Sequence, residues 1–370
     1  MPTSTRLALA LALALVAPAC ASTVVPIAPD AAADAPQDVA RDVSPDVSPD
    51  APDGDVGPVF PCSAVVVASG FSLLEGMFGT GRVVIDPARR APVLVSFSSG
   101  AIVRVAPDTG ALTRFAPPRY PGDVGRAAVF VDEGVGALVV VPLPDAPAAP
   151  TQVLSLDLAR PDRWETTGII TSAAPSGTPY AVAGFDPTNR SLRVVSGDPY
   201  LTAQRSVWDL RFTAGGWGWA RRADFVTPRP VEAHTVTWNA ARARLLVVTS
   251  DSVGPWGLWS VGADASTQLP QTLPREGGAP VVAHDPARRV SWALATTPAG
   301  ATLTALPDDA AGAVRSVTVG DPMRALNPST GSAWAAFDAI GRRLYAYADN
   351  ISGGRTSFLT AVDVDRCLPR

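Results

Sequence analysis

The chain has 370 residues, of which 47% are hydrophobic and 17% are charged, a balance that supports a sizeable core and argues against global disorder. Its net charge of −4 is unevenly placed, with −7 in residues 21–60 and +2 in residues 61–370, so neither nucleic acid nor an anionic membrane surface is expected to bind the folded part. With 37 Pro and 31 Gly residues, long uninterrupted helices are disfavoured and turns must be frequent.

The first twenty residues, MPTSTRLALALALALVAPAC, predict an export signal. Arg6 precedes an apolar run over 7–16 that is too short to span a bilayer as a stable helix and is typical of a secretory signal. The segment APAC at 17–20 resembles the lipobox of bacterial lipoproteins, although Ala stands where Leu is usual. This resemblance implies a signal peptide at 1–19 and lipidation of Cys20, which becomes the first residue of the mature chain. Ordinary cleavage after Ala19 or Ala21 is the alternative.

Residues 20–60 are expected to form a disordered tether. Asp recurs at every fourth position from 30 to 50, among Ala, Val, Ser and Pro. In a helix these like charges would share one face, which is unfavourable, and the Pro residues would interrupt the helix. Calcium binding is the alternative, but Asp residues at this spacing provide no compact cage of oxygen ligands. The segment would reach roughly 35 Å as a flexible coil, or up to about 120 Å as polyproline II.

These features predict an exported protein whose lipid, attached at Cys20, anchors it in a membrane. The expected place is the outer membrane or cell surface of a Gram-negative-type bacterium. A periplasmic or a secreted protein is the alternative, and the sequence does not decide which leaflet holds the anchor.

Six similar segments follow between residues 83 and 349. In each, a short strand of small and β-branched residues ends at Asp or Asn, and a turn leads into a second apolar strand, as in VAGFDPTNRSLRVVSG at 182–197. The Asp or Asn side chain can cap its own turn, and a following Pro presets the backbone angle. These turn anchors, spaced by 46, 54, 53, 46 and 53 residues, are Asp86, Asp132, Asp186, Asn239, Asp285 and Asp338. A ring of ligands is the alternative interpretation, but turn chemistry is sufficient to explain them.

Further strands complete each repeat. A third strand is clearest at 152–158 and 206–212, and a fourth, often with Trp, at 160–167 and 215–222. Four short strands in a period near fifty residues are characteristic of propeller blades. We therefore predict an all-β fold, a six-bladed β-propeller with four-stranded antiparallel blades over residues 61–370. A seventh, degenerate blade is the alternative, although the length of this part matches six repeats.

The repeats resemble those of bacterial kelch-like propellers, the superfamily that includes galactose-oxidase-type domains, over the whole of 61–370. The resemblance is carried by FDPTNRSLRVVSG, SVWDLRF and GGWGW, in the family's order of turn, strand, glycine and Trp-containing strands. The paired glycines of kelch repeats survive only as SG at 99–100 and 196–197, and most repeats lack the final Trp. Copper chemistry of the galactose-oxidase type would need Tyr, His and a crosslinkable Cys, and with five Tyr and two His it is not expected.

The two ends of the folded part are predicted to meet in the last blade. Its strands near 334–338, 343–348 and 357–364 leave one strand missing, and CSAVVVAS at 62–69 belongs to no repeat, so 63–68 is assigned as the missing outer strand. Cys62 and Cys367 would then flank the join. Exported chains keep disulfides, and these two thiols remain when Cys20 is removed or lipidated. We predict a disulfide between them in place of the absent hairpin; two unrelated cysteines are the alternative.

The motifs predict no catalytic residue, no metal and no cofactor. The sequence has no nucleophile elbow, HExxH, P-loop or dinucleotide fingerprint. The two histidines, His234 and His284, fall at different registers of adjacent repeats, so a shared metal site is not expected. Asp363 and Asp365 alternate on the last predicted strand, where acid or base catalysis is conceivable but solvated carboxylates are commoner.

Most of the nine Trp residues fall in strands, where packing between blades explains them. In SVGPWGLWS at 252–260, Trp256 stands between Pro and Gly, a context that would suit a turn, so Trp256 and Trp259 are candidate ligand-binding residues on an exposed platform; packing between blades is the commoner arrangement for such residues. The predicted function is noncatalytic binding of a protein or glycan by a monomeric, tethered propeller. The alternatives are a polysaccharide-active lyase or hydrolase with channel-facing carboxylates, and a purely structural surface protein.

Overall fold

The computed structural model divides the chain into two parts, Met1–Val56 and Gly57–Arg370. The structure describes residues 62–71, 81–96, 100–117, 127–143, 151–160, 162–170, 172, 182–196, 203–213, 216–229, 232–250, 255–273, 279–297, 300–309, 312–320, 333–350 and 356–368. The predicted signal peptide, Cys20 and the tether lie outside these residues. Within the described part, no helix has the length and hydrophobicity that crossing a membrane requires.

The described residues fold almost entirely into antiparallel strands, which we group in four-stranded units numbered along the chain. Unit 1 contains β2 (Gly81–Asp86), β3 (Ala91–Ser96), β4 (Ile102–Val105) and β5 (Leu112–Phe115). Unit 2 contains β6 (Ala127–Asp132), β7 (Ala137–Pro142), β8 (Thr151–Asp157) and β9 (Trp164–Ile170). Unit 3 contains β10 (Val182–Asp186), β11 (Ser191–Ser196), β12 (Gln204–Thr213) and β13 (Gly216–Arg221), and the short β14 (Phe225–Val226) pairs with β12.

The remaining strands repeat this order. Unit 4 contains β15 (Glu232–Asn239), β16 (Arg244–Ser250), β17 (Trp256–Val261) and β18 (Ser266–Leu273). Unit 5 contains β19 (Val281–Asp285), β20 (Val290–Thr297), β21 (Gly300–Pro307) and β22 (Arg315–Val319). Unit 6 contains β23 (Ala333–Asp338), β24 (Arg343–Asn350), β25 (Thr356–Asp363) and, from the other end of the chain, β1 (Ala64–Phe71). Units 2 and 3 count as one nine-stranded sheet because a single parallel pair, Trp217↔Ile170, joins their outer strands.

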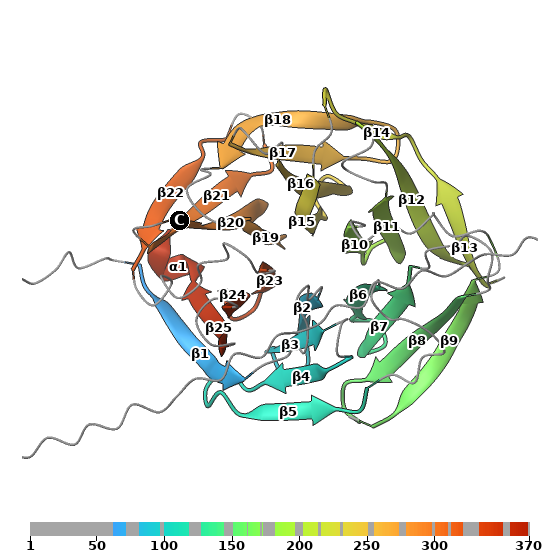
Figure 1. Cartoon of the computed structure of the whole chain (residues 1–370), viewed down its shortest axis with the longest axis horizontal. Coiled ribbons are helices and arrows are strands. Elements are labelled where there is room, and N and C mark those ends of the chain that lie inside the picture. Colours follow the sequence, from blue (N-terminus) through green and yellow to red (C-terminus); the bar gives the residue numbers. More distant parts are fainter. Residues whose placement is uncertain are drawn as a thin grey trace, which may run out of the picture. The chain divides into compact units, whose positions relative to one another are not determined.

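The sheets follow one another around a ring, with the first strand of each unit innermost (Figure 1). Each innermost strand contacts those of the two neighbouring units, and the contact between β2 and β23 closes the circle. The core is correspondingly divided into six hydrophobic clusters, each of which joins the facing surfaces of two adjacent units. A second strand such as β3 or β11 is therefore buried on both faces, whereas the outermost β5 and β18 keep exposed side chains.

The two ends of the described chain meet in unit 6, as predicted. β1 pairs antiparallel with β25, beginning at Ala64↔Val362. A disulfide joins Cys62 to Cys367, whose Cα atoms are 4.4 Å apart across a sequence separation of 305. The backbone oxygen of Cys62 also accepts a hydrogen bond from Gly320 N in unit 5, at 3.0 Å. The disulfide thus links the two chain ends that together form unit 6.

The end of the chain differs from the prediction at one point. Asp363 and Asp365 do not share the face of a strand, because the strand ends at Asp363 and a single helical turn follows, α1 (Val364–Cys367). The Asp363 carboxylate accepts hydrogen bonds from Asp365 N and Arg366 N, at 3.1 and 3.2 Å. Asp363 is the helix N-cap, a position where Asp is strongly preferred, and this capping ends the strand.

Candidate functional site

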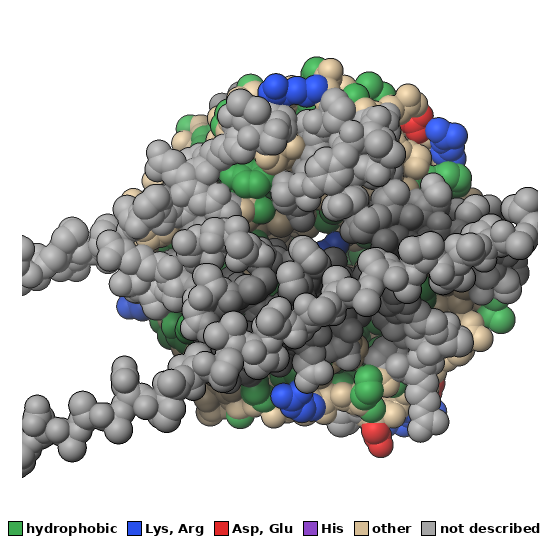
Figure 2. Space-filling view, viewed as in Figure 1, with side chains coloured by type: hydrophobic (Ala, Val, Ile, Leu, Met, Phe, Trp, Pro, Cys, Tyr) green, Lys and Arg blue, Asp and Glu red, His purple; other side chains and the backbone are tan. Residues whose placement is uncertain are grey.

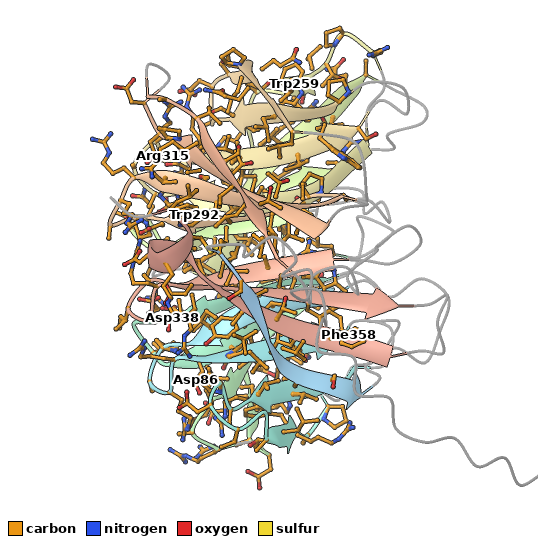
Figure 3. All side chains as sticks on the ribbon, turned by 90° about the vertical axis from the view of Figure 1, so that its left-hand side faces the viewer. Asp86, Trp259, Trp292, Arg315, Asp338 and Phe358 are labelled. Atoms are coloured by element: carbon orange, nitrogen blue, oxygen red, sulfur yellow. A yellow bond between two sulfur atoms is a disulfide. The ribbon has the colours of Figure 1, made fainter. Side chains whose placement is uncertain are left out.

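The six turn anchors end the innermost strands, and their side chains are buried within the turns that follow. Each accepts a hydrogen bond from a backbone N–H two or three residues further on, as Asp285 does from Ala287 N and Arg288 N at 3.1 and 3.2 Å. Figure 3 shows Asp86 and Asp338 on the same face of the ring as Trp292 and Arg315, with Phe358 towards the opposite face.

The fourth turn residue has a positive φ in every unit, a conformation that L residues other than Gly adopt rarely. Only one of these residues is glycine; they are Arg90, Gly136, Arg190, Ala243, Arg289 and Arg342, with φ between 46° and 64°. The contacts of the arginine side chains compensate for this unfavourable backbone conformation. Three of the four arginines extend to the anchor of the preceding unit, so the strain is offset by ion pairs between units.

These ion pairs run in one direction around the ring. Arg90 Nη2 lies 3.2 Å from Asp338, Arg190 Nη2 lies 2.7 Å from Asp132, and Arg342 Nη2 lies 2.6 Å from Asp285. The first pair also explains Gly341, because a Cβ there would collide with Arg90 Nη2 and with the Asp338 carboxylate. The carboxylates of Asp132, Asp285 and Asp338 are thus each engaged by their own turn and by an arginine of the next unit.

The other anchors have different partners. Asp86 is paired with Arg104 Nη1 at 3.2 Å, because Gly136 of the next unit has no side chain to offer. Asn239 needs no cation and donates from Nδ2 to Asp308 Oδ1 at 2.5 Å. Among the described residues no group of three or more His, Cys, Asp or Glu side chains could hold a metal ion.

His284 lies between units 4 and 5 in a mostly buried polar cluster. Its Nδ1 is 3.3 Å from Ser291 Oγ and 3.9 Å from Asp308 Oδ1. Burial lowers the pKa of His284, and the nearby carboxylates of Asp308 and Asp285 offset this only in part. His284 is therefore neutral in the folded protein at neutral pH. His234 belongs to β15, but the position of its side chain is not described.

Acid is expected to destabilise the fold through His284. Because its pKa is lower in the folded than in the unfolded chain, whose value is about 6.5, the unfolded chain takes up the extra proton as the pH falls below 6.5. The free energy of unfolding should then fall by up to about 1.4 kcal/mol per pH unit until the folded pKa is reached. Urea unfolding between pH 7.5 and about 5.5 measures this. His284→Gln should flatten the decline and His234→Gln should not; equal slopes in all three proteins would refute the assignment.

The predicted aromatic platform does not exist. Trp256 and Trp259 are each only 7% exposed. Trp256 begins β17 rather than lying on a turn and packs in the cluster between units 4 and 5. Trp259 packs between units 3 and 4, with its ring edge-on to Phe225 at 5.2 Å between centroids. The Pro-Gly context suggested a turn, but the interface between sheets buries both rings.

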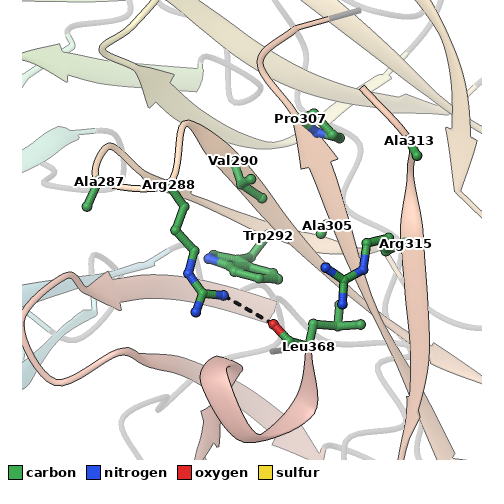
Figure 4. A pocket seen from close by; sticks show the side chains of 9 residues that line it. All are labelled: Ala287, Arg288, Val290, Trp292, Ala305, Pro307, Ala313, Arg315 and Leu368. Carbon is green, nitrogen blue, oxygen red and sulfur yellow. Dashed lines mark hydrogen bonds between the residues drawn. The ribbon is translucent and has the colours of Figure 1, made fainter. Parts of the chain in front are cut away.

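A pocket of about 410 Å³ lies between unit 5 and the residue that follows α1. Nine residues line it: Ala287, Arg288, Val290, Trp292, Ala305, Pro307, Ala313, Arg315 and Leu368. Figure 4 shows the guanidinium groups of Arg288 and Arg315 on either side of the Trp292 ring, with Leu368 below it. The volume is in the range of small-molecule sites, and the apolar lining with a few polar groups is typical of them.

Arg288 is held in place at the edge of this pocket. Its Nη1 donates to the backbone oxygen of Leu368 at 3.2 Å, and its Nη2 lies 2.5 Å from Asp365 Oδ1. The guanidinium carbon is 6.0 Å from the centre of the Trp292 ring. Its Nε is buried and has no hydrogen-bond acceptor among the described residues.

Asp365 brings a carboxylate to the same edge. Its side chain is 42% exposed and is paired with Arg288 and with Arg342 Nε, the latter at 3.2 Å. Arg342 also forms an ion pair with the buried Asp285. Burial raises the pKa of Asp285, but the Arg342 guanidinium and the Arg288 backbone N–H lower it by more, so the pKa of Asp285 lies below its usual value. One network thus links the turn of unit 5, the turn of unit 6 and α1.

Sequence reasoning missed this pocket. Its residues come from 287–292, 305–315 and 368, and no motif joins these three stretches. The only available signal was the closure of the ring, which places the end of the chain beside unit 5. On the face seen in Figure 2, the described charged side chains lie singly around the rim and form no single-sign patch.

Comparison with known proteins gives a fold but no family. No family model matches the sequence, and no curated protein matches it. An aldose sugar dehydrogenase from Streptomyces coelicolor, solved with PQQ bound, is 14% identical, with 83% of this chain and 100% of that chain covered and a TM-score of 0.51. A glucose dehydrogenase is 13% identical over 81% and 98% of the two chains, with a TM-score of 0.50. A gluconolactonase from Xanthomonas campestris is 13% identical over 79% and 88%, with a TM-score of 0.46.

The two dehydrogenase likenesses show that this chain has a β-propeller fold. The predicted noncatalytic binding function is contradicted by these two likenesses, because both proteins are enzymes, an aldose sugar dehydrogenase and a glucose dehydrogenase. That prediction rested on the absence of recognised motifs, and such an absence does not exclude a site assembled from distant strands.

Proposed function

We propose that the chain is a carbohydrate-active enzyme, a lyase or hydrolase, built on a six-bladed kelch-like propeller. The six four-stranded units, the anchor in each first turn and the closure by β1 support six blades. The pairing of Cys62 with Cys367 secures the last blade. Fold alone does not fix chemistry, so the proposal depends on the pocket beside unit 5.

The observation that carries this proposal is the pairing of a sugar-sized pocket with an accessible carboxylate. The lining includes the ring of Trp292, which is only 1% exposed, and the guanidinium groups of Arg288 and Arg315. Asp365 adjoins them through its ion pair with Arg288. A carboxylate there has the chemistry to take a proton from water in hydrolysis, or from a sugar carbon in elimination. The anchor carboxylates are buried within their turns, whereas the Asp365 side chain is 42% exposed, so the anchors are excluded from this role.

We further propose that the enzyme is exported and works as a monomer at the cell envelope. The apolar run at 7–16 and Cys20 support a lipidated N-terminus, and the Asp-rich segment up to residue 60 supports a solvated spacer. A propeller on such a spacer can reach polymers around its anchor. Mass spectrometry of the mature N-terminus tests the lipid, and an unmodified first residue would refute it.

Activity is tested by incubating the purified full chain with envelope polysaccharides. Hydrolysis releases new reducing ends, and elimination also creates a double bond detectable by ultraviolet absorbance. Asp365→Asn should lower either rate by about 100-fold or more, the usual contribution of a positioned base. Asp157→Asn is the matched control, since Asp157 is also a partly exposed carboxylate, 3.0 Å from Arg160. Failure of the wild-type chain on every polymer would overturn the proposed function, and a fully active Asp365→Asn variant would overturn the assigned base.

A further inference from the structure

The turn of unit 5 makes no ion pair with the anchor of unit 4. Arginines at the equivalent turn position of three other units pair with the preceding anchor, but the anchor that precedes Arg289 is Asn239, which carries no charge. Asn239 instead donates from Nδ2 to Asp308 Oδ1 at 2.5 Å. Asp308 follows β21 of unit 5, and its backbone N donates to Arg289 O at 2.9 Å. A carboxylate therefore takes the place that an arginine has at the other interfaces.

This arrangement leaves the second oxygen of the Asp308 carboxylate without a partner. The side chain is only 1% exposed, and its Oδ2 receives no hydrogen bond from any described residue. The neutral His284 does not supply one, because its Nδ1 lies 3.9 Å from Oδ1, beyond hydrogen-bond distance. Burying an ionised carboxylate is unfavourable unless hydrogen bonds replace its contacts with water. A further donor is therefore expected at Oδ2.

A small cavity of about 30 Å³ adjoins Asp308 at the interface of units 4 and 5. The guanidinium groups of Arg242 and Arg244 line it, and neither has a hydrogen bond or an ion pair with another described residue. The volume exceeds the roughly 10–15 Å³ that one water molecule needs. It is too small for a sugar or another organic ligand. The other polar lining residues are Asn239, Ser260 and Ser291.

We infer that an ordered water molecule binds in this cavity and links Asp308 to the two arginines. Water can donate to Asp308 Oδ2 and accept from a guanidinium N–H at the same time, and buried waters commonly serve polar groups that otherwise lack partners. A halide ion of similar size would be repelled by the carboxylate. The water thus joins units 4 and 5 at the place where other interfaces use a direct ion pair between an arginine and an anchor.

A high-resolution crystal structure of the full chain tests the site directly. Electron density for a water oxygen should lie about 2.5–3.0 Å from Asp308 Oδ2. An empty cavity would overturn the inference, and so would Arg242 or Arg244 in direct contact with the carboxylate. A crystal soaked in sodium bromide distinguishes water from a halide, because bromide scatters anomalously. An anomalous peak in the cavity would overturn the assignment to water.

Ser260→Val should displace the water, because Ser260 lines the cavity from β17 and the added methyl group fills the space. Asp308 Oδ2 would then have no donor, and the equilibrium constant for unfolding, measured in urea, should rise about 5- to 30-fold. Ser155→Val is the matched control. Ser155 is 7% and Ser260 6% exposed, and Ser155 pairs with Val139 in unit 2 as Ser260 pairs with Leu246 in unit 4. The control should change the constant by less than about twofold.

A double-mutant cycle separates the loss of the water from overpacking of the cavity. Asp308→Ala removes the carboxylate that the water serves, so Ser260→Val should cost much less in that background than in the wild type. An equal cost in both backgrounds would mean that Ser260→Val acts by overpacking alone, and would overturn the proposed role of the water. Neither experiment needs a substrate, so the outcome does not depend on the proposed function.

Discussion

Loss of the Cys62–Cys367 disulfide is expected to lower the free energy of unfolding by about 5 kcal/mol, the largest single effect that this structure predicts. The bond closes a loop with a sequence separation of 305, so it removes a great deal of conformational freedom from the unfolded chain. It also holds β1 and α1 together, at the one place where no hairpin joins the third and fourth strands of a unit. The variant to measure is Cys62→Ala combined with Cys367→Ala, by urea unfolding.

Cys20→Ala is the control for this experiment, since that cysteine lies outside the described propeller and should leave unfolding unchanged. A strong thiol reductant should bring the wild type to the stability of the double variant. The pocket supplies a second readout, because Leu368 follows Cys367 directly and its backbone oxygen positions Arg288. The rate of polysaccharide cleavage should fall in the double variant even where it remains folded. A loss of stability below about 1 kcal/mol would mean that strand pairing alone closes the ring.

The repeating part of the fold was predictable because its causes are local. An Asp such as Asp186 caps its turn through backbone N–H groups only two and three residues away, so the same chemistry recurs visibly in each repeat. The second strands carry apolar residues at nearly every position because both of their faces are buried between sheets. The closing disulfide was predictable for a related reason, because the repeat pattern shows which strand is missing and where.

The parts that were not predicted depend on neighbours in the ring. Trp256 follows a Pro and precedes a Gly, but its exposure is decided by unit 5, which packs over it. Local propensity would place Gly or Asn at a fourth turn residue with positive φ, whereas Arg342 is found because Asp285 lies opposite in another unit. The pocket likewise appears only once the end of the chain is seated beside unit 5. Each of these features depends on a contact between units, which the sequence of a single repeat does not reveal.

The contribution of the ion pair between Arg342 and Asp285 to stability can be measured by making the same substitution at two equivalent positions. Arg289 and Arg342 occupy the same turn position in units 5 and 6, with φ of 54° and 58°. Replacing either by Gly relieves a left-handed backbone worth about 1–2 kcal/mol, partly offset by the greater freedom of Gly in the unfolded chain. Only Arg342 also holds the fully buried Asp285, at 2.6 Å, and Asp365.

Arg342→Gly should therefore lower the free energy of unfolding by about 2–3 kcal/mol, because stranding a buried carboxylate costs about 3–5 kcal/mol and the relieved strain returns part of it. Arg289→Gly should leave stability unchanged or raise it by up to about 1 kcal/mol. Urea unfolding at pH 7 measures both. The loss in Arg342→Gly should shrink in acid as Asp285 becomes protonated, since a neutral carboxyl no longer needs the cation. Equal stability of the two variants would show that the interlocking arginines contribute nothing, and that the ring is held by its apolar interfaces alone.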